Sequence, residues 1–270
     1  MSTQPRLASA VMLLRDMASR QGIEVFMVRR VIQSDFMPDV FVFPGGSVSA
    51  DDRAAEQAKQ VCTPVAPARA DPEGRTILGS GTRAAAIREL FEEAGVLLAY
   101  RGEQILAIGE EDVARFDGYR LAFNQRKGSL IDMAHAENLR LATDLLGYFA
   151  HWITPEGMPK RFDTHFFITT APAEQQAAHD RLETSDGIWI SPAEALARSE
   201  RNEFPLVFAT IHQLRELAVF HSVKEALEAS AMQHVVTHVP ILEQGAEGTR
   251  VYLPDDAANK WDVPDHMTRS

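Results

Sequence analysis

Apolar and polar residues alternate in short blocks along the first part of the chain. Residues 8–14 and 23–28 are apolar segments joined by a polar turn at residues 15–22, a pattern that predicts two strands. A shorter apolar stretch, residues 40–43, ends at Pro44 and two glycines, which punctuate a strand. The amino-terminal part is therefore predicted to form strands of a sheet.

The spacing of apolar residues becomes helical at residues 82–94. Ile87 and Leu90 fall on the side of such a helix that would be buried, whereas three glutamates of the same segment fall on the other side. Thr82 is predicted to cap this helix, and Gly95 stands where a helix ending in a left-handed residue favours glycine.

The remaining pattern predicts a mixture of strands and helices without an internal repeat. Strands are predicted at residues 148–153, 165–169 and 187–190, helices at 192–199, 206–220 and 223–234, and a hairpin at 239–242 and 249–253. We therefore expect an α+β fold with a mixed β-sheet between α-helices, followed by a C-terminal helical extension.

Carboxylates gather on the polar side of the predicted helix. Glu89, Glu92 and Glu93 follow Arg88 at spacings that place all three on one helical face. Such a cluster repels itself unless a cation lies within it, and all-oxygen ligands suit Mg²⁺ or Mn²⁺. The alternative interpretation is a solvated acidic face without a ligand.

Residues 88–96 resemble the second half of the Nudix box, whose pattern is G-x5-E-x7-R-E-U-x-E-E-x-G-U with U aliphatic. Gly46 resembles the first glycine of the box, and Asp52 stands where the pattern has its first Glu. Forty-one residues separate Gly46 from Arg88, against thirteen in the pattern, so 28 extra residues lie within the box. Residues 53–80 lack sustained apolar periodicity, and we interpret them as a surface insertion.

The flanking sequence resembles one Nudix subgroup, the mammalian peroxisomal or mitochondrial coenzyme A diphosphatases, which carry a long insertion at the same place. The matching segments are residues 25–30, 36–38, 42–46, 92–98, 151–155, 161–167 and 189–196. This resemblance implies a Nudix fold and a Nudix hydrolase domain at residues 5–200. A helical extension and hairpin tail would then occupy residues 201–270.

The resemblance also implies a role for each residue of the helix. Glu92 and Glu93 would be the main metal ligands, and Glu89 a further ligand or the base that takes a proton from water. Arg88 would hold the carboxylates in place through a bidentate ion pair, with Asp52 as the predicted partner. Arg88, Glu89, Glu92 and Glu93 are the predicted catalytic residues.

Residues outside the helix complete the predicted site. The absence of a side chain at Gly46 would let the backbone approach the metal and the substrate phosphates. Arg29 and Arg161 are candidates for contacts with those phosphates, and ordinary surface ion pairs are the alternative. Nudix enzymes often recruit one more carboxylate from a distant loop, for which Glu183 and Asp163 are candidates.

Two other groups of reactive side chains carry weaker signals. His234 and His238 have the i, i+4 spacing of a helical zinc pair but lack an adjacent Glu and a third ligand, so we do not expect zinc there. Cys62 is the only cysteine, which excludes an internal disulfide, and with no His nearby in sequence it is not expected to be a catalytic thiol.

Composition and charge limit the classes of partner that the protein is expected to bind. A formal net charge of −11 argues against a surface for nucleic acid. The apolar run at residues 7–14 is too short to span a membrane and lacks a cleavage-site pattern, and the chain does not end in Ser-Lys-Leu. We therefore expect a cytoplasmic protein that binds neither nucleic acid nor membrane. A homodimer through the helical extension is a further hypothesis.

The resemblance implies a metal-dependent hydrolase of a small molecule in which a nucleoside diphosphate is linked to another moiety. Coenzyme A or an acyl-coenzyme A is the favoured substrate, giving 3',5'-ADP and a phosphopantetheine. An ADP-ribose or NADH-type pyrophosphatase is the alternative within this class. A nucleotide-binding Nudix module without turnover is the alternative outside it, but catalytically dead relatives typically lose glutamates that this chain retains.

Overall fold

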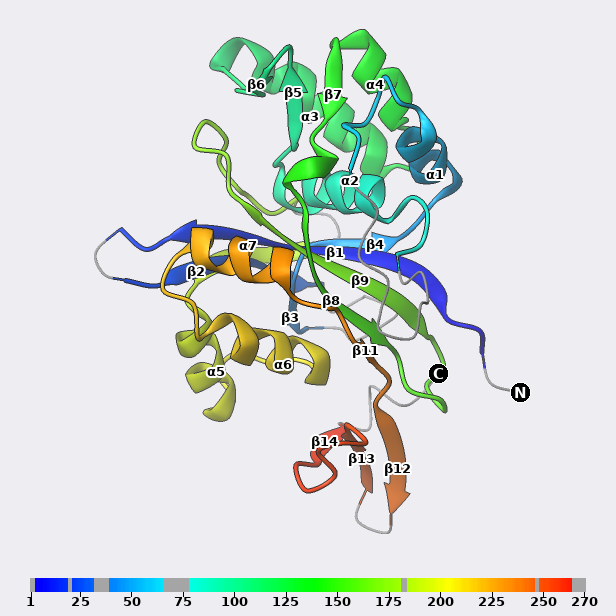
Figure 1. Cartoon of the computed structure of the whole chain (residues 1–270), viewed down its shortest axis with the longest axis vertical. Coiled ribbons are helices and arrows are strands. Elements are labelled where there is room, and N and C mark those ends of the chain that lie inside the picture. The colour runs from blue at the N-terminus through cyan, green and yellow to red at the C-terminus, as the bar shows by residue number, and fades with distance from the viewer. Residues whose placement is uncertain are drawn as a thin grey trace.

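The computed structural model describes residues 3–18, 21–31, 39–65, 78–180, 184–245 and 248–263. Its centre is a mixed sheet in the order β10-β2-β1-β9-β8-β11, with β3 paired to β2 and β4 paired to β1 (Figure 1). The pairs β1–β9 and β8–β11 are parallel, and the other pairs are antiparallel. Its strands are β1 (Arg6–Asp16), β2 (Ile23–Arg30), β3 (Phe41–Val42), β4 (Gly45–Ser47), β8 (Gly147–Ile153), β9 (Phe162–Thr170), β10 (Thr184–Ile190) and β11 (Thr237–His238).

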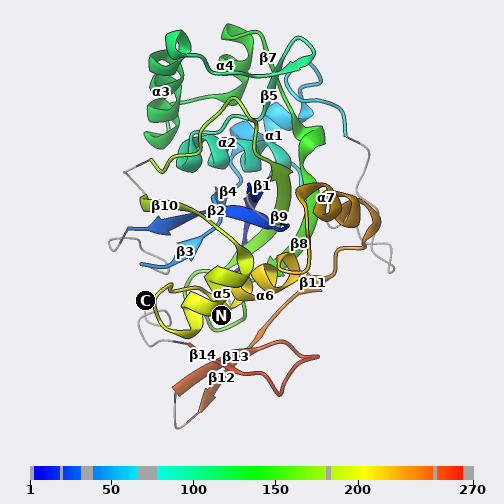
Figure 2. The same ribbon diagram turned by 90° about the vertical axis from the view of Figure 1, so that its left-hand side faces the viewer.

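Helices cover both faces of this sheet. One face packs against α2 (Thr82–Ala94), which is covered by α1 (Ala50–Gln57) and α3 (Glu110–Asn124), with α4 (Leu130–Ala136) on α1; the other face packs against α5 (Pro192–Glu200), α6 (Phe208–Leu217) and α7 (Val223–Met232). Figure 2 shows α2 above the sheet and α5 and α6 below it. The predicted α+β class, with a mixed sheet between helices, is confirmed.

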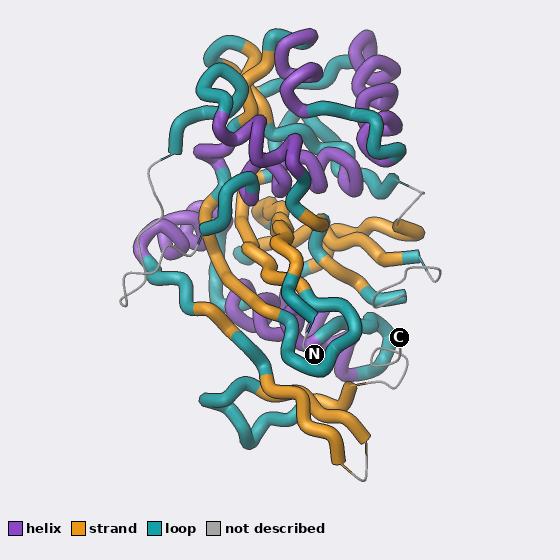
Figure 3. The backbone as a smooth tube through the Cα atoms, turned by 90° about the vertical axis from the view of Figure 1, so that its right-hand side faces the viewer, coloured by secondary structure: helices purple, strands orange, loops and turns teal. Residues whose placement is uncertain are grey.

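Two small sheets and a short helix complete the chain. The strands β5 (Ala99–Arg101), β6 (Gln104–Ile105) and β7 (Leu139–Leu141) pair in the order β6-β5-β7 beside α3 and α4, and a 3₁₀ helix spans Thr143–Leu145. The tail strands β12 (Ile241–Gly245), β13 (Gly248–Tyr252) and β14 (Trp261–Val263) form a separate antiparallel sheet at the far end of the molecule (Figure 3). The predicted hairpin is confirmed, and it gains a third strand.

Alternation along β1 explains the two hydrophobic cores. Val11 and Leu13 are fully buried in the cluster that includes α2, whereas Met12 and Leu14 are fully buried in the cluster that includes α6. Successive side chains of a strand point to opposite faces, so a continuously apolar strand serves both layers. The central sheet therefore separates an α2 face from an α6 face.

Helix α2 has the predicted bounds, but its first turn differs from the prediction. Gly81 is the N-cap residue, in the left-handed region at φ 87°, and the Thr82 hydroxyl donates to the Gly79 carbonyl at 2.8 Å. The predicted Thr82 cap is therefore wrong, because a capping side chain must accept from a helical N–H. Gly95 ends the helix at φ 70°, with its N–H donating to the Phe91 carbonyl, as predicted.

The prediction that residues 53–80 form a surface insertion is wrong for their first part. Helix α1 runs into this segment and packs on α2, and its Ala55 is fully buried. Cys62 is also buried and forms an isolated parallel bridge with Leu141. Helix α1 buries only a short apolar surface against α2, so its sequence does not need a long periodic pattern of apolar residues. Residues 66–77 lie outside the described residues.

The C-terminal helices pack against the central sheet. Helix α7 contacts β8, β9 and β1, and α6 shares the hydrophobic cluster of the α6 face. The predicted division at residue 200 between a Nudix domain and an extension stays a prediction. Among the helices that the structure describes, none has the length and apolar content required to cross a membrane.

Candidate active site

Strand β4 lies directly against the polar face of α2. In the sheet, Gly46 is paired with Ser9 of β1. A Cβ atom added to Gly46 would overlap the carboxylate of Glu89, coming within 2.6 Å of its Cδ. Real Cβ atoms do not approach other heavy atoms so closely. Only glycine therefore allows the β4 backbone to lie this close to the carboxylate.

The neighbouring glycine orients a second carboxylate. The Gly45 N–H donates to Glu93 Oε2 at 3.1 Å. A Cβ at Gly45 would lie 2.6 Å from the Ser9 carbonyl oxygen and the Ala10 Cβ, so β4 is also pressed against β1 at this position. The two glycines thus bring backbone to two of the three predicted metal ligands.

Arg88 links α2 to the end of β4 and to α1. Its Nε and Nη2 donate to the two carboxylate oxygens of Asp52 at 2.8 and 2.9 Å, and Nη2 also donates to the Ser47 carbonyl at 3.0 Å. Its Nη1 lies 2.7 Å from Glu89 Oε1 and 3.0 Å from Glu92 Oε1. The predicted bidentate pair between Arg88 and Asp52 is confirmed.

Asp52 reaches this position through the first turn of α1. Its carboxylate accepts from the Ser49 N–H at 2.7 Å, while the Ser49 hydroxyl accepts from the Asp52 N–H at 3.1 Å, which is a capping box. Asp52 is fully buried. The first turn of α1, just before the insertion, therefore supplies the acid that faces Arg88.

The electrostatics of the cluster favour a bound cation. Asp52, Glu89 and Glu92 contact one guanidinium, a formal excess of two negative charges when all are ionised, and Glu93 adds a further carboxylate on the same helix. Burial raises the pKa of Glu89 to about 7, with Arg88 opposing the shift and Glu92 adding to it. Burial acts to lower the pKa of Arg88, but the carboxylates of Glu89 and Asp52 outweigh it and raise that pKa.

This donor set fits a hard divalent ion. The side chains of Glu89 and Glu92 are 10% and 13% exposed, and Glu93 is buried as a whole residue. Carboxylate oxygens that are partly desolvated and in excess over the cations around them bind such an ion well. The residues present therefore fit the divalent metal that Nudix hydrolases generally use.

Arg120 on α3 was not foreseen from the sequence. Its Nε donates to the Glu92 carbonyl at 2.8 Å, and its Nη2 donates to the Glu93 carbonyl at 3.0 Å and the Ala178 carbonyl at 2.7 Å. A cation at the C-terminal end of a helix binds the unpaired carbonyls and interacts favourably with the negative end of the helix dipole. Arg120 therefore fixes the end of α2 that carries the ligands.

The two arginines predicted to contact substrate phosphates lie elsewhere. Arg29 alternates with Val28, which packs on the α2 face, and its Nε lies 2.9 Å from Asp39 Oδ1. Arg161 is buried, and its guanidinium donates to the Thr154 carbonyl. These placements give no support to the predicted phosphate contacts, which stay predictions.

Within the described residues, neither candidate for an additional metal-binding carboxylate is seen in the α2 cluster. Glu183 lies outside the described residues. Asp163 lies on β9, where its carboxylate accepts a hydrogen bond from His151. His234 and His238, which have the spacing of a helical pair but are not expected to bind zinc, do not share a helix, because α7 ends at Met232 and His238 belongs to β11.

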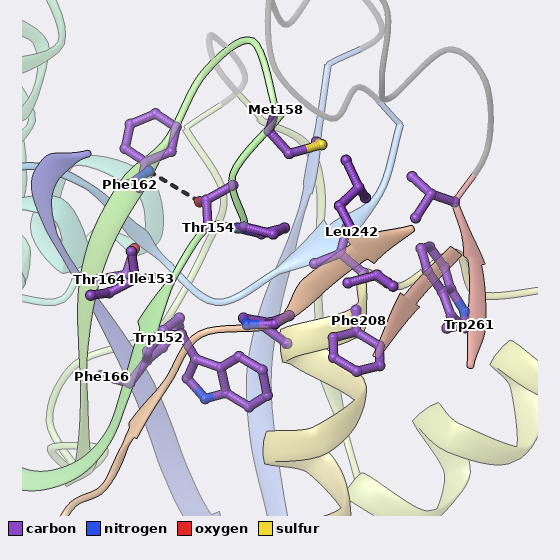
Figure 4. A pocket seen from close by; sticks show the side chains of 16 residues that line it. Trp152, Ile153, Thr154, Met158, Phe162, Thr164, Phe166, Phe208, Leu242 and Trp261 are labelled. Carbon is purple, nitrogen blue, oxygen red and sulfur yellow. Dashed lines mark hydrogen bonds between the residues drawn. The ribbon is translucent and has the colours of Figure 1, made fainter. Parts of the chain in front are cut away.

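An apolar pocket of about 170 Å³ lies between the ends of β8 and β9, the start of α6 and the tail sheet (Figure 4). Trp152, Phe166 and Phe208 form one side, and Leu242 and Trp261 form the side contributed by the tail. Trp152 and Phe166 belong to the cluster of the α6 face, opposite α2. The pocket is therefore distinct from the carboxylate cluster.

A mixed sheet between helices, with carboxylates of one helix set against a Gly-Gly strand, defines the Nudix class of hydrolases. The model of the NUDT19 Nudix domain matches residues 6–217, so the chain belongs to this family of Nudix hydrolases.

Individual relatives agree with this assignment. The chain is 25% identical over 267 residues to acyl-coenzyme A diphosphatase NUDT19 of Xenopus laevis, covering 86% of this chain and 70% of that protein. The protein of the same name from Gallus gallus is 29% identical over 287 residues, covering 86% and 72%. These names confirm the predicted resemblance to the coenzyme A diphosphatase subgroup.

A solved structure confirms the fold. The crystal structure of a NUDIX hydrolase from Alicyclobacillus acidocaldarius superposes with a TM-score of 0.69 and 25% identity, covering 84% of this chain and 96% of that one. The similarity extends over nearly the whole of that protein, so the Nudix fold expected from the sequence is present.

Proposed function

We propose that this protein hydrolyses the diphosphate bond of coenzyme A or an acyl-coenzyme A, releasing 3',5'-ADP and a phosphopantetheine or acyl-phosphopantetheine. The observation that carries the proposal is the α2 carboxylate cluster, held by Arg88 against the glycines of β4. The relatives named acyl-coenzyme A diphosphatase support the choice of substrate.

We further propose Mg²⁺ or Mn²⁺ as the divalent ion. Glu89, Glu92 and Glu93 would hold it, with the backbone of Gly46 beside them. When bound, the ion neutralises charge on the phosphoryl oxygens and makes the attacking water more acidic. All-oxygen ligation favours these ions over softer ones.

The protein's own residues supply the proton transfer and its alignment. In the metal-free chain burial raises the pKa of Glu89 to about 7, and a carboxyl whose pKa lies near neutral suits a general base. Arg88 holds the Glu89 and Glu92 carboxylates from one guanidinium, so both keep a fixed position. Glu89 serves as this base or as a third ligand.

The reaction balances without a further reactant. The oxygen of water bonds to one phosphorus of the diphosphate, and the bond from that phosphorus to the bridging oxygen breaks. The bridging oxygen leaves with the second phosphorus, and the proton of water passes to a carboxylate oxygen. The products are two phosphomonoesters, one of them 3',5'-ADP.

A substrate panel tests the proposal. Release of 3',5'-ADP from coenzyme A and acetyl-coenzyme A is measured beside release of AMP from ADP-ribose and NADH, each with Mg²⁺, with Mn²⁺ and with chelator. We expect metal-dependent cleavage of the coenzyme A compounds. A preference for ADP-ribose or NADH would replace the substrate, and no cleavage of any compound would favour a binding module.

The remaining expectations about the protein are proposals of the same kind. A cytoplasmic location is tested by imaging the full-length protein in its own cells. A homodimer is tested by light scattering on the purified protein, where a mass of about one chain would contradict it.

A further inference from the structure

A row of polar residues crosses the central sheet beside the active site. In the register of the strands, Gly46 pairs with Ser9, Ser9 with His165, His165 with His151, and His151 with Thr237. Neighbouring strands are about 4.8 Å apart, so His165 lies about 10 Å from Gly46 across the sheet.

The histidines of this row lie on the α2 face. Phe167 packs in the hydrophobic cluster of that face. His165 and Asp163 precede it along β9 at intervals of two residues, so they lie on the same face. The rings of His151 and His165 are stacked, with centroids 4.2 Å apart and planes at 10°. Both imidazoles therefore share the face that carries the carboxylates of α2.

Two imidazole nitrogens converge on one carboxylate. His151 Nε2 lies 2.5 Å from Asp163 Oδ1, and His165 Nε2 lies 3.7 Å from the same oxygen. All three atoms lie within 4.8 Å of one another. The longer separation exceeds a hydrogen bond, so His165 Nε2 makes no direct hydrogen bond to this oxygen.

The opposite nitrogen of each ring is already engaged. His151 Nδ1 lies 2.8 Å from Thr237 Oγ1, and His165 Nδ1 lies 2.8 Å from the Tyr148 hydroxyl. Histidines that bind metals are oriented in this way, by a hydrogen bond at the nitrogen that does not coordinate. Both Nε2 atoms therefore lie beside the same oxygen of Asp163.

We propose that His151, Asp163 and His165 form a second metal site, for Zn²⁺ or a similar first-row transition ion. Ligand atoms about 2.05 Å from a tetrahedral ion lie about 3.3 Å apart, so binding would lengthen the 2.5 Å separation, shorten the 3.7 Å separation and turn the stacked imidazoles out of their parallel planes. Two histidines and a carboxylate form a set typical of zinc sites with an open fourth position.

The burial of the three ligands fits this assignment. His151 and His165 are 6% and 1% exposed, whereas the Asp163 side chain is 33% exposed. An ion would therefore enter from the Asp163 side, where water could complete its coordination. Imidazole nitrogen also distinguishes this site from the all-oxygen cluster on α2, since it suits Zn²⁺ far better than Mg²⁺.

Metal binding to the full-length protein tests this proposal independently of catalysis. The chelated and dialysed protein is titrated with Co²⁺, a spectroscopic substitute for Zn²⁺, in excess Mg²⁺ that saturates the α2 carboxylates. We expect one equivalent of Co²⁺ with the visible absorption of a four-coordinate site with nitrogen ligands. Zn²⁺ should displace it and raise the midpoint of thermal unfolding.

Variants identify the ligands. His151→Gln and Asp163→Asn should each weaken Co²⁺ binding by more than ~10-fold, since even a residue that only orients a ligand is worth that much. Asp163→Asn is the safer variant because this side chain is partly exposed. His238→Gln is the matched control, since His238 neighbours Thr237 on β11 and packs on Trp152.

The outcomes are decisive. Co²⁺ binding that is lost in His151→Gln and Asp163→Asn, but kept in His238→Gln and Glu93→Gln, supports the site. Binding that is competed by Mg²⁺ or lost in Glu93→Gln would place the ion on α2 and overturn the proposal. Unchanged binding in folded His151→Gln and Asp163→Asn, or no binding in excess Mg²⁺, would overturn it as well.

Discussion

Replacing Glu89 by Gln should stabilise the metal-free protein, although Glu89 belongs to the predicted catalytic set. In the folded chain, burial raises the pKa of this carboxyl from 4.5 to about 7, so ionising it at neutral pH costs folding free energy. Glutamine has the same shape as the protonated acid and can still accept from Arg88. The substitution therefore removes the cost of the charge.

The magnitude follows from the two pKa values. At about 1.36 kcal/mol for each pKa unit, the variant should gain about 3 kcal/mol in its free energy of unfolding at pH 8. A folded pKa above the unfolded value means that the wild type keeps its full stability below pH 4.5 and loses it as pH rises through 7. At pH 5 the gain should thus fall below about 1 kcal/mol.

Urea unfolding in the presence of chelator, at pH 5 and pH 8, measures the difference. Mg²⁺ at about 1,000 times its dissociation constant should reverse the order at pH 8, because it stabilises the wild type by about 4.1 kcal/mol, more than the variant gains. Glu228→Gln is the control, since Glu228 is 68% exposed and lies 3.7 Å from Lys224. A chelated Glu89→Gln protein that is less stable than wild type at pH 8 would refute the reasoning.

Three further predictions follow from particular contacts. Arg88→Ala should lower the free energy of unfolding by about 3–5 kcal/mol in chemical denaturation, because it leaves the buried Asp52 without its ion pair. Gly46→Ala should reduce Mg²⁺-dependent turnover by about 100-fold through displacement of a ligand, whereas Gly118→Ala, in open space on α3, should leave turnover unchanged. Burial raises the pKa of Cys62 to about 12, so a thiol reagent at pH 8 should modify it only when the chain unfolds.

Helix α2 could be predicted from the sequence because the residues that define it lie close together along the chain. Ile87 and Leu90 mark the buried side within three residues of each other, and Gly95 marks the end. The same window contains Arg88 and all three glutamates, so the face they share follows from helical geometry.

Other parts of the site depend on packing that no local pattern reports. Arg120 reaches the end of α2 only because α3 packs beside it, 28 residues further along the chain than Glu92. His151, Asp163 and His165 come together through the register of β8 and β9. Helix α1 is different, because Ser49, three residues before Asp52, is a local capping signal, although residues 53–80 show no sustained apolar periodicity.

The most direct test of the account is release of 3',5'-ADP from coenzyme A by wild type and Glu93→Gln at saturating Mg²⁺. Glutamine can still accept from the Gly45 N–H but carries no charge for the ion. We expect a folded variant with turnover reduced by more than ~100-fold. Removal of a residue that only orients a metal ligand can already cost about 100-fold, and Glu93 is assigned as a ligand itself. Near-normal release by Glu93→Gln would contradict the assignment of the α2 carboxylates as the metal site.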